Sequence, residues 1–361
     1  MRRVFSSLLL SPDHSPDVLL PLLIFPFLTF AAVYFILHQS LVQNGLQLKI
    51  STICHPDSAP HPYQLPYTNI TEVDQLLCGM VAFFHALVDP AYNALLAVLF
   101  PAVGVAVLIP FLEASRDNPP FALRMPTAIG VLFQLATMGV IMPFYSLLFV
   151  ITYAASSQAS VIPNSTLTIN QGNAEALLFG LLLGYILPTA LMVSFVHPSV
   201  TATWQGFPIL FAFAIFVHKL IRPPSRLAQS GHATVMVTLA FTFLLSGLLH
   251  MIYVWPIITD TAALRTMFLP VIDPAFDLEK TSLVDGVLTF VKWDLVFSLG
   301  SVILGTFWAA DRLLTLVGML VWYGIATILV GPAAAIAGVF LLRERQLNGR
   351  NQTEKVPQKM E

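Results

Sequence analysis

The apolar residues of this chain lie in long runs, and this feature limits the folds that it can adopt. The chain contains eight such runs, at about 18–38, 94–112, 126–152, 174–196, 203–221, 233–257, 284–308 and 313–341. Each has about the length at which a helix crosses the hydrocarbon core of a bilayer. Only 10% of the 361 residues are charged, whereas soluble domains carry roughly 25%. The sequence therefore predicts an all-α polytopic membrane protein with a bundle of about eight transmembrane helices. The fifth run is the weakest, so seven is the alternative count.

We expect one structural domain. Residues 1–342 form the predicted helical transmembrane domain, the segment 39–93 is its first lumenal loop, and the polar residues 343–361 form a cytosolic tail. The stretch "TEVDQLLCGMVAFFHALVDP", residues 71–90, repeats apolar residues at helical spacing and carries acids at both ends. This pattern predicts an interfacial helix, or a re-entrant one, inside the first lumenal loop.

The distribution of lysine and arginine predicts the orientation in the membrane, because positively charged loops stay on the cytosolic side. With eight spans and a cytosolic N-terminus, most of the basic loop residues fall in the cytosol, and both termini lie there. Lys219, Arg222 and Arg226 are a local exception, because this arrangement places them on the lumenal side. We expect an integral protein of the endoplasmic reticulum membrane.

The predicted lumenal loops hold two kinds of modifiable residue. The triplets that begin at Asn69 and Asn164 match the acceptor pattern for N-glycosylation, so both are candidate glycosylation sites. Both cysteines of the chain, Cys54 and Cys78, fall in the first loop, where the compartment is oxidising. They form either a disulfide or two unpaired thiols.

Charge and motifs exclude several function classes. The net charge is −2 and the basic residues are dispersed, so no nucleic-acid-binding surface is expected. The segment "DPAFDLE", residues 273–279, holds three acids, but it does not match a DDxxD diphosphate–magnesium motif. No HExxH, CxxC pair or glycine-rich phosphate loop occurs either. We therefore expect neither a metal nor a cofactor.

One acid lies deep in the seventh apolar run, in "FVKWDLVFSLGS", residues 290–301. Asp294 is about 15 Å from the edge of this run at 1.5 Å per residue. A carboxyl group near the middle of a bilayer costs about 2.5 to 3.5 kcal/mol on insertion scales, so it normally faces a cavity or a partner. Burial also disfavours the ionised form of a carboxyl. The position therefore predicts that Asp294 holds a proton and acts as an acid.

Aromatic residues surround this acid on the helix. Phe290, Asp294 and Phe297 share one helical face, and Trp293 is adjacent. Aromatic rings stabilise cations through cation–π attraction, so these three rings are candidates for lining a substrate site. The alternative interpretation is that this face packs against a neighbouring helix and that Asp294 pairs with a basic group or with a backbone carbonyl.

A second candidate site lies where the second apolar run ends, in "FLEASRDNPPFALRMP". Glu113, Arg116 and Asp117 are spaced so that they can form a small ionic cluster on one helical face. This cluster is either an ordinary solvated helix end or a functional group in which Glu113 points into the bundle and Arg116 contacts the substrate or tunes the acid.

Three stretches carry a resemblance to a known family. The segments "LLCGMVAFFHALVDP", "FLEASRDNPP" and "KWDLVFSLGS" resemble the integral-membrane terpene cyclases of fungal meroterpenoid pathways, in particular the ascochlorin and ascofuranone type. The resemblance implies a farnesylated phenolic substrate that is protonated at an epoxide or an alkene and closes a ring without metal. It also implies two catalytic carboxyls, which fall at Glu113 and Asp294 here.

The resemblance thus predicts an acid-initiated cyclase, an isomerase-like or lyase-like enzyme. Asp294 is the expected proton donor, and Glu113 is a second carboxyl that holds or relays the proton. The partners are a prenylated aromatic small molecule and the lipid bilayer. A proton-coupled small-molecule transporter, with Asp294 as its protonated gate, is the alternative function.

Overall fold

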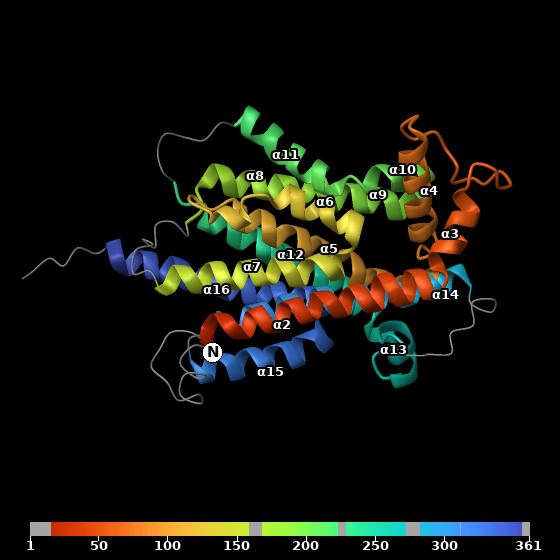
Figure 1. Ribbon diagram of the computed structural model, residues 1–361. Coiled ribbons are helices and arrows are strands. Elements are labelled where there is room, and N and C mark those ends of the chain that lie inside the picture. Colours follow the sequence, from red (N-terminus) through yellow and green to blue (C-terminus); the bar gives the residue numbers. More distant parts are fainter. Residues whose placement is uncertain (1–15, 159–167, 223–228, 272–281, 311, 356–361) are drawn as a thin grey trace, which may run out of the picture.

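The computed structural model describes residues 16–158, 168–222, 229–271, 282–310 and 312–355. Within these ranges the chain is helical, and its one β-type contact is an isolated bridge between Asn170 and Ser230. The long helices lie roughly side by side in one bundle (Figure 1). The prediction of an all-α fold is therefore confirmed.

The longer elements follow one another along the chain as helices with several internal breaks. They are α2 (Pro16–Ala32), η1 (Val33–Gln43), α3 (Leu46–Cys54), α4 (Thr71–His85), α5 (Asn93–Ala114), α6 (Pro126–Ala136), α7 (Met138–Gln158), α8 (Gln171–Leu181), η5 (Leu182–Ile186), α9 (Leu187–Phe195), α10 (Pro198–Trp204), α11 (Phe207–Ile221), α12 (His232–Tyr253), α13 (Thr261–Phe268), α14 (Leu283–Phe307), α15 (Leu313–Leu329) and α16 (Pro332–Lys355). The π-helical elements η1 and η5 continue the helices beside them.

Five helical segments among the described residues are long and apolar enough to cross a membrane. They are Leu19–Gln43, Pro90–Ala114, Gln171–Phe195, His232–Tyr253 and Leu283–Phe307. Helices α10 and α11 form a sixth candidate span that is bent by 66° at its break. The structure thus supports a polytopic helical protein with five or six candidate spans, and the predicted count of eight is not confirmed.

The third predicted span, 126–152, is a pair of helices rather than one crossing. The chain breaks at Thr137, whose φ of 73° ends α6 before α7 begins. Helix α6 starts just after the end of α5, and Tyr153 of α7 donates a hydrogen bond to Glu113 at that same end of α5. The pair therefore enters the bundle and returns to the side from which it came.

The last predicted span, 313–341, is also broken. Helix α15 ends at Leu329, and the chain turns at Gly331, whose φ is 86°. A left-handed backbone of this kind favours glycine, and a Cβ here would lie 2.7 Å from Nδ1 of His250. Helix α16 then continues to Lys355, so the predicted boundary of the polar tail at 343 falls inside a helix.

The two ends of the bundle differ in structure. One end, which we call the cap end, holds α3, α4, α10 and α13 (Figure 1). Nζ of Lys292 in α14 donates a hydrogen bond to the backbone oxygen of Thr266 in α13, which ties α13 to this end. The eight-span scheme places the loops 39–93 and 257–284 on opposite sides of the membrane, whereas the structure places their helices α3, α4 and α13 at the same end of the bundle. We call the other end the Glu113 end.

The cap contains the helix predicted in the first long loop. Helix α4 forms over Thr71–His85, and a disulfide between Cys54 and Cys78 joins it to α3. The two cysteines are therefore paired. Whether α4 lies at the membrane interface stays a prediction.

Helix α5 forms the centre of the bundle. Most of its residues are buried, because it is apolar on every face and other helices surround it. It extends from the cap end, where Leu99 and Val103 face a cavity, to Glu113 at the opposite end.

Candidate active site

A large cavity lies between the cap and the bundle. Its volume is about 530 Å³, within the range of roughly 300–1,000 Å³ that is typical of small-molecule sites. Segments from η1, α3, α4, α5, α6, α11 and α14 contribute to its wall, together with the breaks at residues 137 and 205. The wall is mainly apolar, with a few amides, the exposed Glu72 of α4 and one carboxyl on α14.

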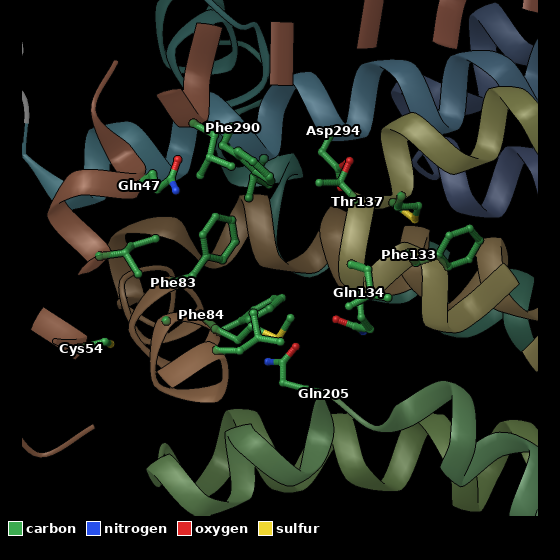
Figure 2. Close-up of a pocket in the computed structure, with 18 of the residues that line it drawn as sticks. Gln47, Cys54, Phe83, Phe84, Phe133, Gln134, Thr137, Gln205, Phe290 and Asp294 are labelled. Carbon is green, nitrogen blue, oxygen red and sulfur yellow. The ribbon is translucent and has the colours of Figure 1, made fainter. Parts of the chain in front are cut away.

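Asp294 is that carboxyl. It projects from α14 toward the cavity, beside Thr137 (Figure 2). Its Oδ1 accepts a hydrogen bond of 2.6 Å from the backbone N–H of Gly139, at the start of α7. No arginine or lysine among the described residues forms an ion pair with it. The alternative interpretation, in which a basic side chain neutralises Asp294, is not what the structure shows.

The break between α6 and α7 produces this contact. The first N–H groups of a helix have no partner within the helix, and they carry the positive end of its dipole. Gly139 lies in this first turn, and it allows α7 to approach α14 closely. A Cβ at this position would be 2.8 Å from Asp294 Oδ1 and 2.9 Å from the backbone oxygen of Asp294.

Aromatic side chains line much of the cavity. They are Phe83, Phe84, Phe133, Trp204, Phe207 and Phe290. Phe290 belongs to the predicted set, and its ring meets that of Phe83 edge-on at a centroid distance of 5.2 Å. The rings of Phe84 and Trp204 meet in the same way at 4.8 Å. The cavity therefore offers several ring faces and edges to an apolar guest.

Trp293 and Phe297 lie elsewhere. Trp293 stacks on Phe35 of η1 at 4.3 Å, and Phe297 stacks on the same ring at 6.1 Å. Both are buried in a small cluster between α2, η1, α7 and α14, and neither is part of the cavity wall. The structure thus separates these two rings from Asp294 and Phe290, although the four residues are close in sequence.

Glu113 and Arg116 form a buried ionic cluster at the far end of α5. Arg116 Nε is 2.7 Å from Glu113 Oε2, and Arg343 of α16 is 2.6 Å from Glu113 Oε1. Arg116 also contacts Glu344 at 2.5 Å. Burial lowers the pKa of Arg116, but the carboxylates of Glu113 and Glu344 raise it more, so it lies well above its usual value.

This cluster is not part of the cavity wall. Val103 faces the cavity, and Glu113 lies ten residues further along α5, which is about 15 Å at 1.5 Å per residue. The structure therefore does not bring the two predicted carboxyls together. Asp117, which the sequence predicts in the same ionic cluster, instead accepts hydrogen bonds from Thr168 and Asn170.

Of the two candidate glycosylation sites, Asn69 is exposed in the cap, just before α4. Asn164 lies outside the described residues. Among the described residues, no three His, Cys, Asp or Glu side chains come together as a metal-binding group.

Comparison with known proteins places this architecture in a family. The model of the CtvD domain matches residues 21–347, which is nearly all of the chain. This chain belongs to the CtvD domain family. Together with the curated relatives named terpene cyclases, this match confirms at the level of the family the resemblance that the sequence predicts. No solved structure matches the chain.

Several curated proteins are similar to this CtvD-family chain over most of its length. The terpene cyclase janA of Penicillium janthinellum is 26% identical over 77% of the chain and 80% of its own length. The terpene cyclase ascI of Acremonium egyptiacum is 24% identical, and the alignment covers 64% of each protein. The FAD-dependent monooxygenase verC1 of Penicillium polonicum is 25% identical over 70% of the chain, but the match covers 33% of verC1.

The sequence did not point to three features of this CtvD-family site. Gly139 and Thr137 form the break beside Asp294, and Gln205 lies in the wall at the break between α10 and α11. The sequence did contain an indication of the break at Gln205. "WQGFP", residues 204–208, places a glycine and a proline inside an apolar run, which predicts a break in a helix.

Proposed function

We propose that this protein is a membrane-bound terpene cyclase that protonates a farnesylated phenolic substrate and closes a ring. One observation carries the proposal. Asp294 lies in the wall of an apolar, ring-lined cavity, free of a basic partner among the described residues, in a chain whose family relatives include proteins named terpene cyclases. The volume and the apolar lining of the cavity suit an apolar small-molecule substrate such as a farnesylated phenol.

The proposed reaction begins with proton transfer from Asp294 to the oxygen of a terminal epoxide, or to a terminal alkene. As the C–O bond of the epoxide breaks, the π electrons of an internal alkene attack the tertiary carbon and form the ring bond. The resulting cation is quenched by loss of a proton or by the phenolic hydroxyl, which then releases its own proton. Either proton returns to Asp294, so the reaction is an isomerisation.

Residues around Asp294 support each stage. The Gly139 N–H and the positive end of α7 stabilise the carboxylate that remains after the proton has left. Phe290 and Phe83 offer their rings to the passing cation. An apolar wall also keeps bulk water from quenching the cation early.

An epoxide is the favoured target of protonation. The relative verC1 is named as an FAD-dependent monooxygenase, and about a third of its chain matches this protein. A flavin monooxygenase transfers one oxygen atom to its substrate, and an epoxide is the product when that substrate is an alkene. A chain that joins a flavin monooxygenase segment to a segment like this protein would make an epoxide next to the domain that opens it.

Glu113 and Arg116 lie away from the cavity, so we propose for them a structural role in place of the catalytic and substrate-binding roles that the sequence predicts. Their buried ion pairs link α5 to α16, and Arg343 stacks over Phe149 and Tyr153 at 5.2 and 4.9 Å. We infer that this cluster holds the Glu113 end of the bundle together and does not relay the proton. Trp293 and Phe297 likewise support η1 rather than line the substrate site.

We infer that the Glu113 end faces the cytosol and the cap faces the lumen of the endoplasmic reticulum. The helices and connections that meet at the Glu113 end carry many basic residues, among them Arg116, Arg124, Lys219, Arg222, Arg312, Arg343 and Arg345. Arg222 belongs there because it pairs with Glu175 at the start of α8. The return of α6 and α7 thus removes the exception that Lys219 and Arg222 pose for eight spans. It leaves Asn69 and the disulfide in the lumen, where glycosylation of Asn69 is expected.

A transporter is the second candidate, because broken helices beside a central site are typical of transporters. Membrane fractions incubated with a farnesylated phenol epoxide distinguish the two functions. We expect a cyclised product from the parent protein and none from Asp294→Asn, whose amide cannot donate a proton in this way. Asp285→Asn is the matched control, because Asp285 caps the start of the same helix and lies outside the cavity wall. Unchanged substrate with the parent protein, or equal turnover by Asp294→Asn, refutes the proposed acid.

A further inference from the structure

Gln205 is a buried amide without a partner in the described part of the chain. The residue is 6% exposed, and neither Oε1 nor Nε2 of its side chain makes a hydrogen bond there. Buried polar groups are nearly always hydrogen-bonded, because leaving them unpaired costs free energy. An amide with both a donor and an acceptor unpaired therefore points to a group that comes from outside the chain.

The surroundings of Gln205 show where that group lies. The residue lines the same cavity as Asp294, and Figure 2 shows the two side chains on opposite walls. Trp204 and Phe207, its neighbours at the break between α10 and α11, also belong to this wall. The amide is thus framed by aromatic rings, with the rest of the cavity between it and the acid.

Two features of the chain hold the amide in this position. The backbone N–H of Gln205 closes the last turn of α10 by donating to the backbone oxygens of Thr201 and Ala202. Gly206 and Pro208 then start α11 in a new direction, 66° away. The side chain at the bend consequently leaves the helical surface at a fixed point of the cavity wall.

We propose that Gln205 binds the hydroxylated aromatic head of the substrate. This inference rests on the proposed function. The phenolic hydroxyl donates to Oε1, and an oxygen on the neighbouring ring carbon accepts from Nε2, while Trp204 and Phe207 contact the ring. The prenyl chain extends from this head across the cavity past Phe84, and its far end reaches Asp294. Gln205 therefore determines which substrates bind and which carbon of the prenyl chain meets the acid.

The test compares a farnesylated phenol with its methyl ether, which cannot donate from that oxygen. For the parent protein we expect the ether to bind at least about ten-fold more weakly, as judged by calorimetry in detergent and by KM. In Gln205→Leu the two ligands should bind alike, with the phenol weakened to the level of the ether. Thr203→Val is the control, because Thr203 is exposed on α10 and its hydroxyl bonds within the helix.

Thermal unfolding without substrate separates binding from a structural role. Replacing an unpaired buried amide by an apolar side chain removes its desolvation penalty, so Gln205→Leu should unfold at the parent temperature or above it. A lower unfolding temperature, or a Gln205→Leu protein that still prefers the phenol ten-fold, overturns the inference. Selective binding of the phenol by a parent protein that makes no product refutes the cyclase proposal alone, and failure to bind either ligand refutes both.

Discussion

Replacing Gly139 by alanine tests whether the acid depends on close contact between α7 and α14. The added Cβ would lie 2.7 Å from Ile36 Cδ1, 2.8 Å from Asp294 Oδ1 and 2.9 Å from the backbone oxygen of Asp294. Ordinary contacts of this kind begin at 3.4 Å. The Ile36 methyl group can rotate away, but the backbone of α14 cannot, so the two helices must move apart by about half an ångström.

This separation has two energetic consequences. Overpacking in a tight core typically costs about 1 to 3 kcal/mol. The hydrogen bond of 2.6 Å between the Gly139 N–H and Asp294 Oδ1 lengthens or breaks, and an unsatisfied buried group costs about 1 to 3 kcal/mol. We therefore expect Gly139→Ala to lower the free energy of unfolding by about 2 to 6 kcal/mol. Displacing a catalytic group by about 1 Å can reduce turnover on the order of 100-fold.

Two measurements on one preparation check this expectation. Thermal unfolding of the detergent-extracted protein reports the loss of stability, and product formation per folded molecule reports the position of the acid. Gly300→Ala is the control, since Gly300 lies on α14 and nothing is within 4 Å of its added Cβ. If Gly139→Ala cyclises substrate at the parent rate and unfolds at the parent temperature, the contact does not position Asp294.

Two further predictions concern the ends of the bundle. Glu113→Gln leaves Arg116 and Arg343 without their shared carboxylate, so stability should fall by about 3 to 5 kcal/mol, as measured by thermal unfolding, while turnover per folded molecule stays near that of the parent. A turnover loss as complete as that of Asp294→Asn, in a protein of normal stability, would restore the proton relay. In the cap, the disulfide between Cys54 and Cys78 closes a segment with a sequence separation of 24, so replacing both cysteines by serine should destabilise the cap by about 3 kcal/mol. Faster proteolysis confined to the cap checks this, and unchanged cleavage contradicts it.

The sequence predicts the features that depend on single apolar runs. It identifies the helical class because hydropathy records how much of the chain is apolar, and it singles out Asp294 because one acid in such a run is conspicuous. It places Glu113 and Arg116 together because i, i+3 neighbours share a helical face. These predictions need no knowledge of which helices meet.

The features that depend on direction and on distant partners could not be read in this way. The run 126–152 is continuously apolar, but hydropathy does not record that the chain reverses at Thr137. The partners of Arg116 include Glu344, which lies 228 residues away. The sequence predicts a local ionic cluster here, but the structure shows a contact between α5 and α16. Trp293 is adjacent to Asp294 in sequence, but the turn of the helix directs it to Phe35 instead of the cavity.

Each of two helix breaks lies beside a polar group of the cavity wall. Within a bilayer every backbone N–H needs a partner, so a broken helix is tolerated only inside the protein or beside a cavity. The break at Thr137 frees the N–H of Gly139, and Asp294 satisfies it. The bend after Gln205 likewise lies in the cavity wall, and the side-chain amide of that residue has no hydrogen-bond partner in the described part of the chain. Helix α14 has no such break, because it supplies the acid from a side chain and not from its backbone.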